Sequence, residues 1–256
     1  MDLFTGVGVA LVTLLDDAGD VDTAATGALA ADLVGRGMQA VLACGTTGEP
    51  GTLTDAERLD VIRAVRDAVP PGVPVLAGTG ATSLARAAEL TAAAAAAGAD
   101  AVLAWPPPGC DDLVGYYAEL GRVADGLPVL AYHIPWISSP GIPVSALAGL
   151  PVAGLKDSSG DPDRLLAEVA HYPGRTYVGS SALLALAGPI GGTGAILAAA
   201  NAEPELCVAA FAGNAAAQRQ LTDVHLALRE GGVPALKRIL AERRGTIPLS
   251  RPAASE

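Results

Sequence analysis

The chain has 256 residues, of which 51% are hydrophobic and 4% aromatic, and its formal net charge is -11. That length is typical of a single α/β barrel, which needs about 250 residues. The acidic balance argues against nucleic-acid binding, which requires a basic patch, although a few local donors can still hold a small anionic substrate.

Cysteine usage and the start of the chain indicate a cytoplasmic protein. Cys44, Cys110 and Cys207 lie far apart and include no C-x-x-C pair, so we expect neither a disulfide framework nor a structural zinc site. The first residues lack the basic region of a signal peptide, and no uninterrupted apolar run is long enough to span a membrane. We therefore expect a cytoplasmic protein that binds neither nucleic acid nor a membrane.

Apolar, β-branched runs alternate along the chain with segments of helical periodicity. The near-continuous apolar runs are typical of parallel strands that are buried on both faces. Strands are expected over residues 7–15, 40–44, 73–78, 101–105, 127–132, 152–156, 176–179 and 193–199. Helices are expected over residues 23–36, 54–68, 83–97, 112–124, 143–150 and 181–187, and from residues 161 and 204 onward.

Eight strand–helix units predict an α/β fold, a closed (β/α)8 TIM barrel. No linker or low-complexity segment interrupts residues 1–214, which we interpret as the barrel and the catalytic domain. Residues 215–256 are expected to add a short C-terminal helical appendage and a loose tail. Catalytic residues of such barrels stand at the C-terminal ends of the strands, so those ends hold the candidates for chemistry.

Lys156 is the first candidate, because lysine is rare in this chain. Only Lys156 and Lys237 are lysines, against fourteen arginines, and Lys156 ends an apolar run. A partly buried lysine can lose its proton and attack a carbonyl, whereas arginine cannot. The position therefore favours a Schiff-base lysine, and the alternative is a strand-end lysine that only reaches solvent.

Two further strand ends fit imine chemistry with a 2-keto acid. Tyr132 ends the strand before that of Lys156 and could move protons to and from the carbinolamine. The turn Gly45-Thr46-Thr47-Gly48 offers hydroxyls and backbone N–H groups that can hold a carboxylate. Together they predict an enamine that adds to an aldehyde, or that arises from cleavage releasing one.

Five short motifs occur in order, and all but the first stand at a predicted strand end. With them the sequence resembles the pyruvate-dependent class I aldolases and lyases of the dihydrodipicolinate synthase / N-acetylneuraminate lyase family, over roughly residues 3–200. The motifs are Phe4-Thr5-Gly6 with Val12-Thr13, Gly45-Thr46-Thr47-Gly48-Glu49, Ala77-Gly78-Thr79-Gly80, Tyr132-His133-Ile134-Pro135 and Gly154-Leu155-Lys156-Asp157.

The resemblance implies a role for each matching residue. Lys156 is the expected Schiff-base residue, Tyr132 the general acid/base, and Thr46 a member of the proton relay. Substrate-binding positions are expected at Thr47, Gly48, Gly179, Ile196 and Ile137. No cofactor or metal is expected, because the covalent imine on the lysine activates the substrate. The expected partners are pyruvate, an aldehyde and further copies of the chain in a dimer or tetramer.

Two departures from the family pattern bear on the substrate. Ile137 stands where synthases of this family carry an arginine that grips the carboxylate of the aldehyde, and isoleucine cannot form that bidentate pair. Pro108 lies where many members place a relay tyrosine that reaches a neighbouring subunit. Tyr116 and Tyr117 lie in the next helix and are expected to pack there.

Several functions stay open on this sequence. The leading interpretation is a lyase that makes or breaks a carbon–carbon bond in a 2-keto-3-deoxy sugar acid or a 4-hydroxy-2-oxo acid. The alternatives are 4-hydroxy-tetrahydrodipicolinate (dihydrodipicolinate) synthase, a keto-acid dehydratase using the same imine, and a keto-acid-binding protein with reduced or lost turnover. Specificity for the aldehyde is expected to lie in the loops.

Other polar residues are expected to have structural roles. His133 should point away from the pocket because it alternates with Tyr132 along the strand. His171 and His225 are expected at the surface. The remaining expectations are a buried structural thiol at Cys44, loop-ordering carboxylates at Glu49 and Asp157, and Trp136 over the barrel end.

Overall fold

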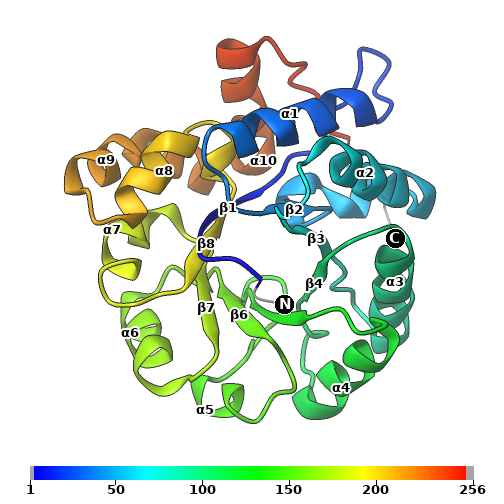
Figure 1. Cartoon of the computed structure of the whole chain (residues 1–256), viewed down its shortest axis with the longest axis vertical. Helices are drawn as coiled ribbons and strands as arrows, with labels where there is room; N and C mark the ends of the chain where they lie inside the picture. Colours follow the sequence, from blue (N-terminus) through cyan, green and yellow to red (C-terminus); the bar gives the residue numbers. More distant parts are fainter. Residues whose placement is uncertain (1–2, 252–256) are drawn as a thin grey trace.

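The computed structural model describes residues 3–251, which form a closed barrel of eight parallel strands surrounded by helices (Figure 1). Each strand pairs with the next along the chain, and the last pairs with the first. This architecture confirms the predicted (β/α)8 TIM barrel. The strands are β1 (Gly6–Ala10), β2 (Val41–Ala43), β3 (Val75–Gly78), β4 (Ala101–Ala104), β5 (Val129–His133), β6 (Gly154–Asp157), β7 (Arg175–Val178) and β8 (Gly194–Leu197).

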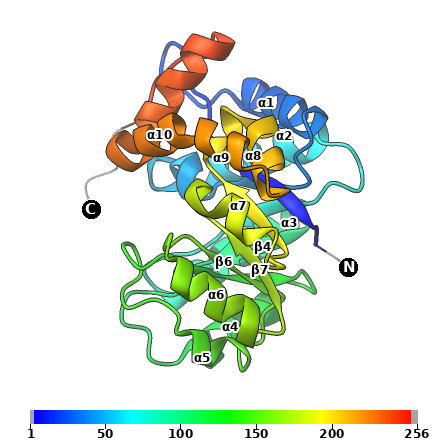
Figure 2. The same ribbon diagram turned by 90° about the vertical axis from the view of Figure 1, so that its left-hand side faces the viewer.

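Helices follow the strands in chain order and cover the outside of the barrel (Figures 1 and 2). A capping box starts one of them: Thr54 N–H donates to the Glu57 carboxylate at 2.7 Å, and Glu57 N–H donates to Thr54 Oγ1 at 3.2 Å. The helices of the barrel are α1 (Thr23–Gly35), α2 (Asp55–Ala68), α3 (Leu84–Ala96), α4 (Leu113–Val123), α5 (Val144–Leu147), α6 (Pro162–His171), α7 (Leu184–Ala187) and α8 (Pro204–Phe211).

The first strand is shorter than predicted, ending at Ala10 where the sequence indicated residue 15. The apolar residues beyond it are buried, but side chains capture their backbone N–H groups in place of a strand ladder. Val12 N–H donates to Asn201 Oδ1 at 3.2 Å, and Leu14 N–H donates to Thr26 Oγ1 at 3.0 Å. Hydrophobicity alone could not distinguish this buried loop from a strand.

Alternation along the strands divides the core into two layers. Within β5, for example, Leu130 and Tyr132 belong to the cluster inside the barrel, whereas Val129 and Ala131 belong to the cluster beneath the helices. In β6, Leu155 packs in the outer cluster. The same alternation must turn its neighbour Lys156 inward.

The barrel interior is packed, so it is not a channel. Phe4 and Tyr177 stack with their ring centroids 4.6 Å apart, and Tyr177 Oη donates to Phe4 O at 2.8 Å. Both side chains lie in the cluster inside the barrel. Open space for a substrate is therefore found at the C-terminal ends of the strands, as expected for this fold.

The C-terminal appendage consists of α9 (Ala215–Gln220) and α10 (Thr222–Arg244). Helix α10 is interrupted at Gly232, which has φ 57° and ψ -147°, and Pro234 follows two residues later. Helix α10 contacts the short turns that follow β7 and β8, η3 (Ser181–Leu183) and η4 (Ala199–Asn201). The appendage, drawn in orange and red in Figure 2, therefore lies over the C-terminal end of the barrel.

A pair of glycine substitutions tests the packing of α7 on α8. Gly188→Ala would place its Cβ 1.8 Å from Phe211 O, so we expect a loss of about 1–3 kcal/mol in the free energy of unfolding. Gly121→Ala in α4 meets no atom within 4 Å, so we expect a gain of about 0.5–1 kcal/mol. Urea unfolding monitored by circular dichroism measures both, and equal stabilities would contradict the predicted close approach.

Candidate active site

Lys156 points into the barrel from β6 and is only 4% exposed. The pairing of β5 with β6 places Tyr132 opposite Lys156. The Lys156 Nζ atom lies 4.4 Å from the centre of the Tyr132 ring. The sequence-predicted nucleophile and its predicted acid/base therefore lie side by side at the C-terminal ends of neighbouring strands.

Ser158 is the hydrogen-bond partner of Tyr132. The two hydroxyl groups are 3.1 Å apart, and both side chains are buried. The proton relay expected between Tyr132 and Thr46 stays a prediction, and both residues line the same cavity. Sequence reasoning missed Ser158, although its position two residues after Lys156 places both on the same side of the chain.

The threonine turn after β2 is shaped by two residues in the left-handed backbone region. Cys44 and Glu49, both with φ 51°, flank the single 3-10 turn η1 (Thr46–Gly48). Gly48 N–H donates to Gly45 O at 2.8 Å within that turn. The first N–H groups of such a turn have no partner inside it, so they are available to a carboxylate.

A cavity of about 200 Å³ opens above the lysine. Five of the eight predicted site residues line it, namely Lys156, Tyr132, Thr46, Thr47 and Gly179. They come from four different strand ends, as is usual for catalytic residues of this fold. Ser158, Ser180 and Trp136 also line the cavity, and Trp136 is 58% exposed at its mouth.

Three predicted substrate-binding residues do not line this cavity. Gly48 is buried, and its carbonyl accepts a hydrogen bond from Thr13 Oγ1 at 2.9 Å. Ile196 is 1% exposed and packs inside the barrel. Ile137 lines a neighbouring cavity, which it shares with Thr46. The substrate-binding roles expected of these three residues stay predictions.

One wall of the cavity comes from α10, which the sequence did not predict. The side of α10 that faces the cavity presents His225, Leu228, Arg229, Gly232 and Val233. The expectation of a surface role for His225 is therefore wrong. Its side chain is half-buried, and its Nδ1 lies 3.0 Å from Ser181 Oγ in a hydrogen bond. The Gly231-Gly232-Val233-Pro234 stretch was the available signal, because it breaks a helix.

Lys237 fastens the second half of α10 to the threonine turn. Its Nζ lies 2.5 Å from the Glu49 carboxylate and donates to Leu249 O at 2.8 Å. Lys237 is 1% exposed, and Glu49 directly follows the turn that contains Thr46 and Thr47. Glu49 thus orders its loop as expected, through an ion pair that also positions the wall of the cavity.

A buried charge cluster supports β6 from outside the barrel. Arg164 Nε lies 2.8 Å from Glu168 Oε1 and 3.7 Å from Asp157 Oδ2. Burial, and then the charge of Asp157, raise the pKa of Glu168 to about 8, against the opposing influence of Arg164. Asp157 also accepts a hydrogen bond from Ser159 N–H at 2.8 Å, so it orders the loop after Lys156 as predicted.

His133 faces away from the cavity, as the alternation predicted. Its Nδ1 accepts a hydrogen bond from Ile142 N–H at 2.9 Å. Burial, together with the charge of Arg164, lowers the pKa of His133 to about 4, so the ring is neutral near pH 7. Tyr116 and Tyr117 likewise pack on their own helix and donate to Trp105 O and Ala104 O.

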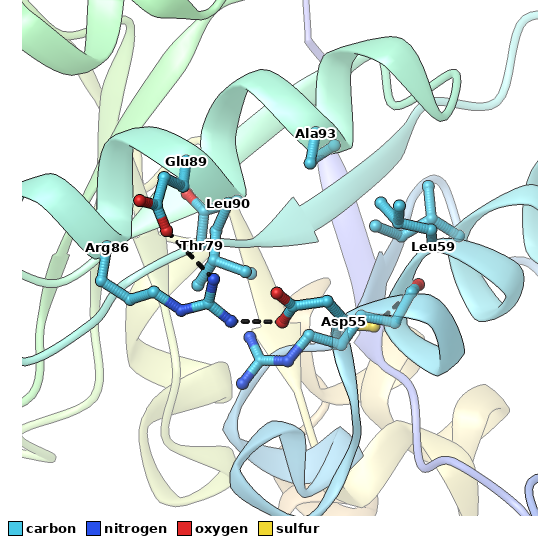
Figure 3. Close-up of a pocket in the computed structure, with 12 residues that line it drawn as sticks. Asp55, Leu59, Thr79, Arg86, Glu89, Leu90 and Ala93 are labelled. Carbon is cyan, nitrogen blue, oxygen red and sulfur yellow. Dashed lines mark hydrogen bonds and ion pairs between the residues drawn. The ribbon is translucent and has the colours of Figure 1, made fainter.

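A second cavity, of about 250 Å³, lies outside the barrel between α2 and α3 (Figure 3). Arg86 bridges Asp55 of α2 and Glu89 of α3 at its mouth. The Cys44 thiol lines this cavity, but burial raises its pKa to about 12, so it is not a nucleophile. The predicted structural role of Cys44 agrees with that environment. The Lys156 cavity is therefore the candidate active site.

Within residues 3–251, no group of three or more histidine, cysteine, aspartate or glutamate side chains is placed to hold a metal ion. The absence of a metal from the reaction stays a prediction from the sequence.

The buried carboxylate of Glu168 predicts a pH dependence of stability. Its pKa of about 8 exceeds the ordinary value of 4.5, so its stabilising effect is complete below pH 4.5 and is lost as the pH rises through 8. We expect Glu168→Gln to lose less stability than the wild type between pH 5 and pH 9 in urea unfolding. The control Glu242→Gln removes an exposed carboxylate of α10, and its free energy of unfolding should depend on pH as that of the wild type does. The same pH dependence in wild type and Glu168→Gln would contradict a raised pKa of Glu168.

Removal of the Lys237 ammonium should leave Glu49 without its partner. We expect Lys237→Met to lower the free energy of unfolding by about 3 kcal/mol, because an unpaired buried charge is costly. The double variant Lys237→Met with Glu49→Gln should recover part of that loss. Arg238→Met, on the exposed side of α10, is the matched control and should change stability by less than about 0.5 kcal/mol. A loss no larger than that of the control would refute the role of the pair.

Comparison with known proteins assigns the family. A model of the dihydrodipicolinate synthetase family matches residues 3–243. The 4-hydroxy-tetrahydrodipicolinate synthase of Thioalkalivibrio sulfidiphilus is 36% identical over 228 residues, which cover 84% of this chain and 78% of that protein. The synthase of Pseudomonas aeruginosa is 36% identical over 235 residues, covering 86% of this chain and 80% of that protein.

Solved structures agree with this assignment. YagE, a prophage protein of the dihydrodipicolinic acid synthase family from E. coli K12 in complex with pyruvate, has a TM-score of 0.87 at 26% identity, covering 99% of this chain and 93% of that one. The dihydrodipicolinate synthase of Acinetobacter baumannii complexed with pyruvate has a TM-score of 0.85 at 26% identity, covering 98% of this chain and 94% of that one. The chain belongs to the dihydrodipicolinate synthetase family.

Proposed function

We propose that the protein is a class I aldolase that binds pyruvate as an imine on Lys156 and makes or breaks a carbon–carbon bond. Its substrate would be a 2-keto-3-deoxy sugar acid or a 4-hydroxy-2-oxo acid. Membership of the family makes the chain a lyase of the aldolase type, as its sequence predicted. The observation that carries the proposal is the buried Lys156, turned into a cavity beside Tyr132.

The first half of the reaction uses Lys156 and its neighbours. The neutral amine attacks the keto carbon of pyruvate, and the carbonyl oxygen takes up a proton to give a carbinolamine. Loss of water then leaves the imine. Tyr132 would move these protons, and its hydrogen bond with Ser158 supports that role. The carboxylate of pyruvate would be held at the turn that carries Thr46 and Thr47.

The second half of the reaction forms the new bond. Removal of a proton from the methyl carbon of the imine gives an enamine, whose carbon attacks the aldehyde. The aldehyde oxygen becomes a hydroxyl by taking a proton, and water hydrolyses the imine to release the product and Lys156. Cleavage follows the same steps in reverse.

A second candidate is 4-hydroxy-tetrahydrodipicolinate synthase, which is the name of the relatives at 36% identity. Ile137 argues against it, because an apolar side chain stands where such synthases are expected to carry a carboxylate-binding arginine. A third candidate is a keto-acid-binding protein with little turnover. Borohydride trapping combined with a measurement of turnover separates it from an enzyme.

Other properties of the proposed enzyme are inferred from the same family. We propose that it works without a cofactor, in the cytoplasm, and as a dimer or tetramer. The residues that the structure describes include no helix long and apolar enough to cross a membrane.

Borohydride trapping tests the covalent step. With pyruvate present, borohydride should reduce the imine and leave a stable pyruvate-derived adduct, seen by intact mass and located by peptide mapping at Lys156. Lys156→Arg should give no adduct, because arginine cannot form the neutral nucleophile. Lys237→Arg, at the other lysine of the chain, is the matched control and should still be labelled. An unlabelled wild-type protein would falsify the proposal, and a labelled protein that converts no aldehyde would favour the binding function.

A further inference from the structure

The charges around the Lys156 cavity differ from those of the whole chain. The chain has 27 acidic and 16 basic residues, yet no aspartate or glutamate lines the cavity. Two basic side chains do line it, Lys156 from β6 and Arg229 from α10. Lys156 is committed to the imine in the proposed reaction, which leaves the guanidinium of Arg229 as the other source of positive charge.

Arg229 is not committed to any structural ion pair among residues 3–251. Most other arginines pair with a carboxylate or a backbone carbonyl, as Arg243 does with Glu203 and Arg251 does with Glu57. Arg229 stands one helical turn after His225, so both lie on the side of α10 that faces the cavity. An unpaired guanidinium with its planar fork of donors is suited to bind a carboxylate from solution.

His225 adds hydrogen-bonding capacity to this end of the cavity without adding charge. Burial first, and then the nearby charge of Arg229, lower the pKa of His225, which keeps the ring neutral at pH 7. The hydrogen bond with Ser181 fixes the ring. One positive charge at this end matches a carboxylate better than a phosphate group, which carries about 1.5 to 2 negative charges.

The Lys156 cavity is small but is not isolated. Its volume of about 200 Å³ is below the range of roughly 300–1,000 Å³ typical of pockets for drug-sized ligands. A cavity of about 580 Å³ adjoins it, and Thr46 and Val233 line both. The apolar Ile137 lines the larger cavity and offers the second substrate no charge.

We propose that Arg229, assisted by His225, binds a carboxylate at the far end of the second substrate and selects aldehydes that carry one. This inference rests on the proposed imine chemistry, because it places the second substrate between Lys156 and α10. Arg229 is thus a specificity-determining residue contributed by the C-terminal appendage. The condensation product would be a 4-hydroxy-2-oxo acid with carboxylates at both ends.

Trapping with two keto acids of equal length tests the subsite without requiring turnover. 2-Oxoadipate mimics the condensed product and carries a second carboxylate, whereas 2-oxohexanoate lacks it. We expect borohydride to trap 2-oxoadipate on the wild-type protein at a lower half-maximal concentration than 2-oxohexanoate. The difference should be roughly 10- to 100-fold, as one charge-assisted hydrogen-bonded pair would give. Arg229→Gln should remove this preference, and Arg229→Lys should retain part of it.

Two controls separate the subsite from the covalent chemistry. For Arg229→Gln, the half-maximal concentration for trapping pyruvate should equal that of the wild type. Arg238 is an exposed arginine of α10 that does not line the cavity, so Arg238→Gln should behave as wild type with all three acids. Trapping of pyruvate with no preference for 2-oxoadipate would overturn only the Arg229 subsite. A failure to trap pyruvate would overturn the proposed function together with it.

Turnover distinguishes a carboxylate from a phosphate as the selected group. At a fixed pyruvate concentration, the KM for succinic semialdehyde should be lower than the KM for butanal. Arg229→Gln should raise the KM for succinic semialdehyde by roughly 10- to 100-fold and leave the KM for butanal unchanged. Glyceraldehyde 3-phosphate should show no such advantage over glyceraldehyde. An Arg229-dependent preference for the phosphate alone would overturn the assignment of a carboxylate.

Discussion

The parallel register between β5 and β6 is the constraint on which the candidate site depends. It sets Tyr132 opposite Lys156, and the alternation of side chains turns both into the barrel. A slip of one residue in either strand would turn its functional side chain outward. The register is held from outside the barrel, where Leu155 packs beneath the helices and Asp157 joins the buried cluster of Arg164 and Glu168.

The C-terminal appendage completes the site that the barrel begins. Helix α10 breaks at Gly232, so its first half can present His225 and Arg229 to the cavity while its second half carries Lys237. The ion pair of Lys237 with Glu49 joins that second half to the turn expected to hold the substrate carboxylate. The appendage and the threonine turn are therefore joined by a direct contact, and residues of both line the cavity.

The sequence predicted what depends on local pattern. Periodicity identified the eight strand–helix units, and the residues at strand ends supplied Lys156, Tyr132 and the threonine turn. It did not identify the contribution of α10, because the placement of that helix depends on contacts between distant parts of the chain, such as the pair of Lys237 with Glu49. The end of the first strand was also missed, since a side chain of Asn201 replaces the strand ladder there.

The scarcity of lysine drew attention to Lys156, but the structure shows that scarcity and burial do not by themselves identify a nucleophile. Lys237 is the more deeply buried of the two lysines, at 1% exposure against 4%. Its ammonium is paired with the Glu49 carboxylate and the Leu249 carbonyl, so its charge is neutralised within the fold. Lys156 faces the ring of Tyr132 and an open cavity, and among the described residues it has no carboxylate partner. What separates the candidate nucleophile from the structural lysine is therefore the set of groups around each amine, which composition and strand pattern cannot specify.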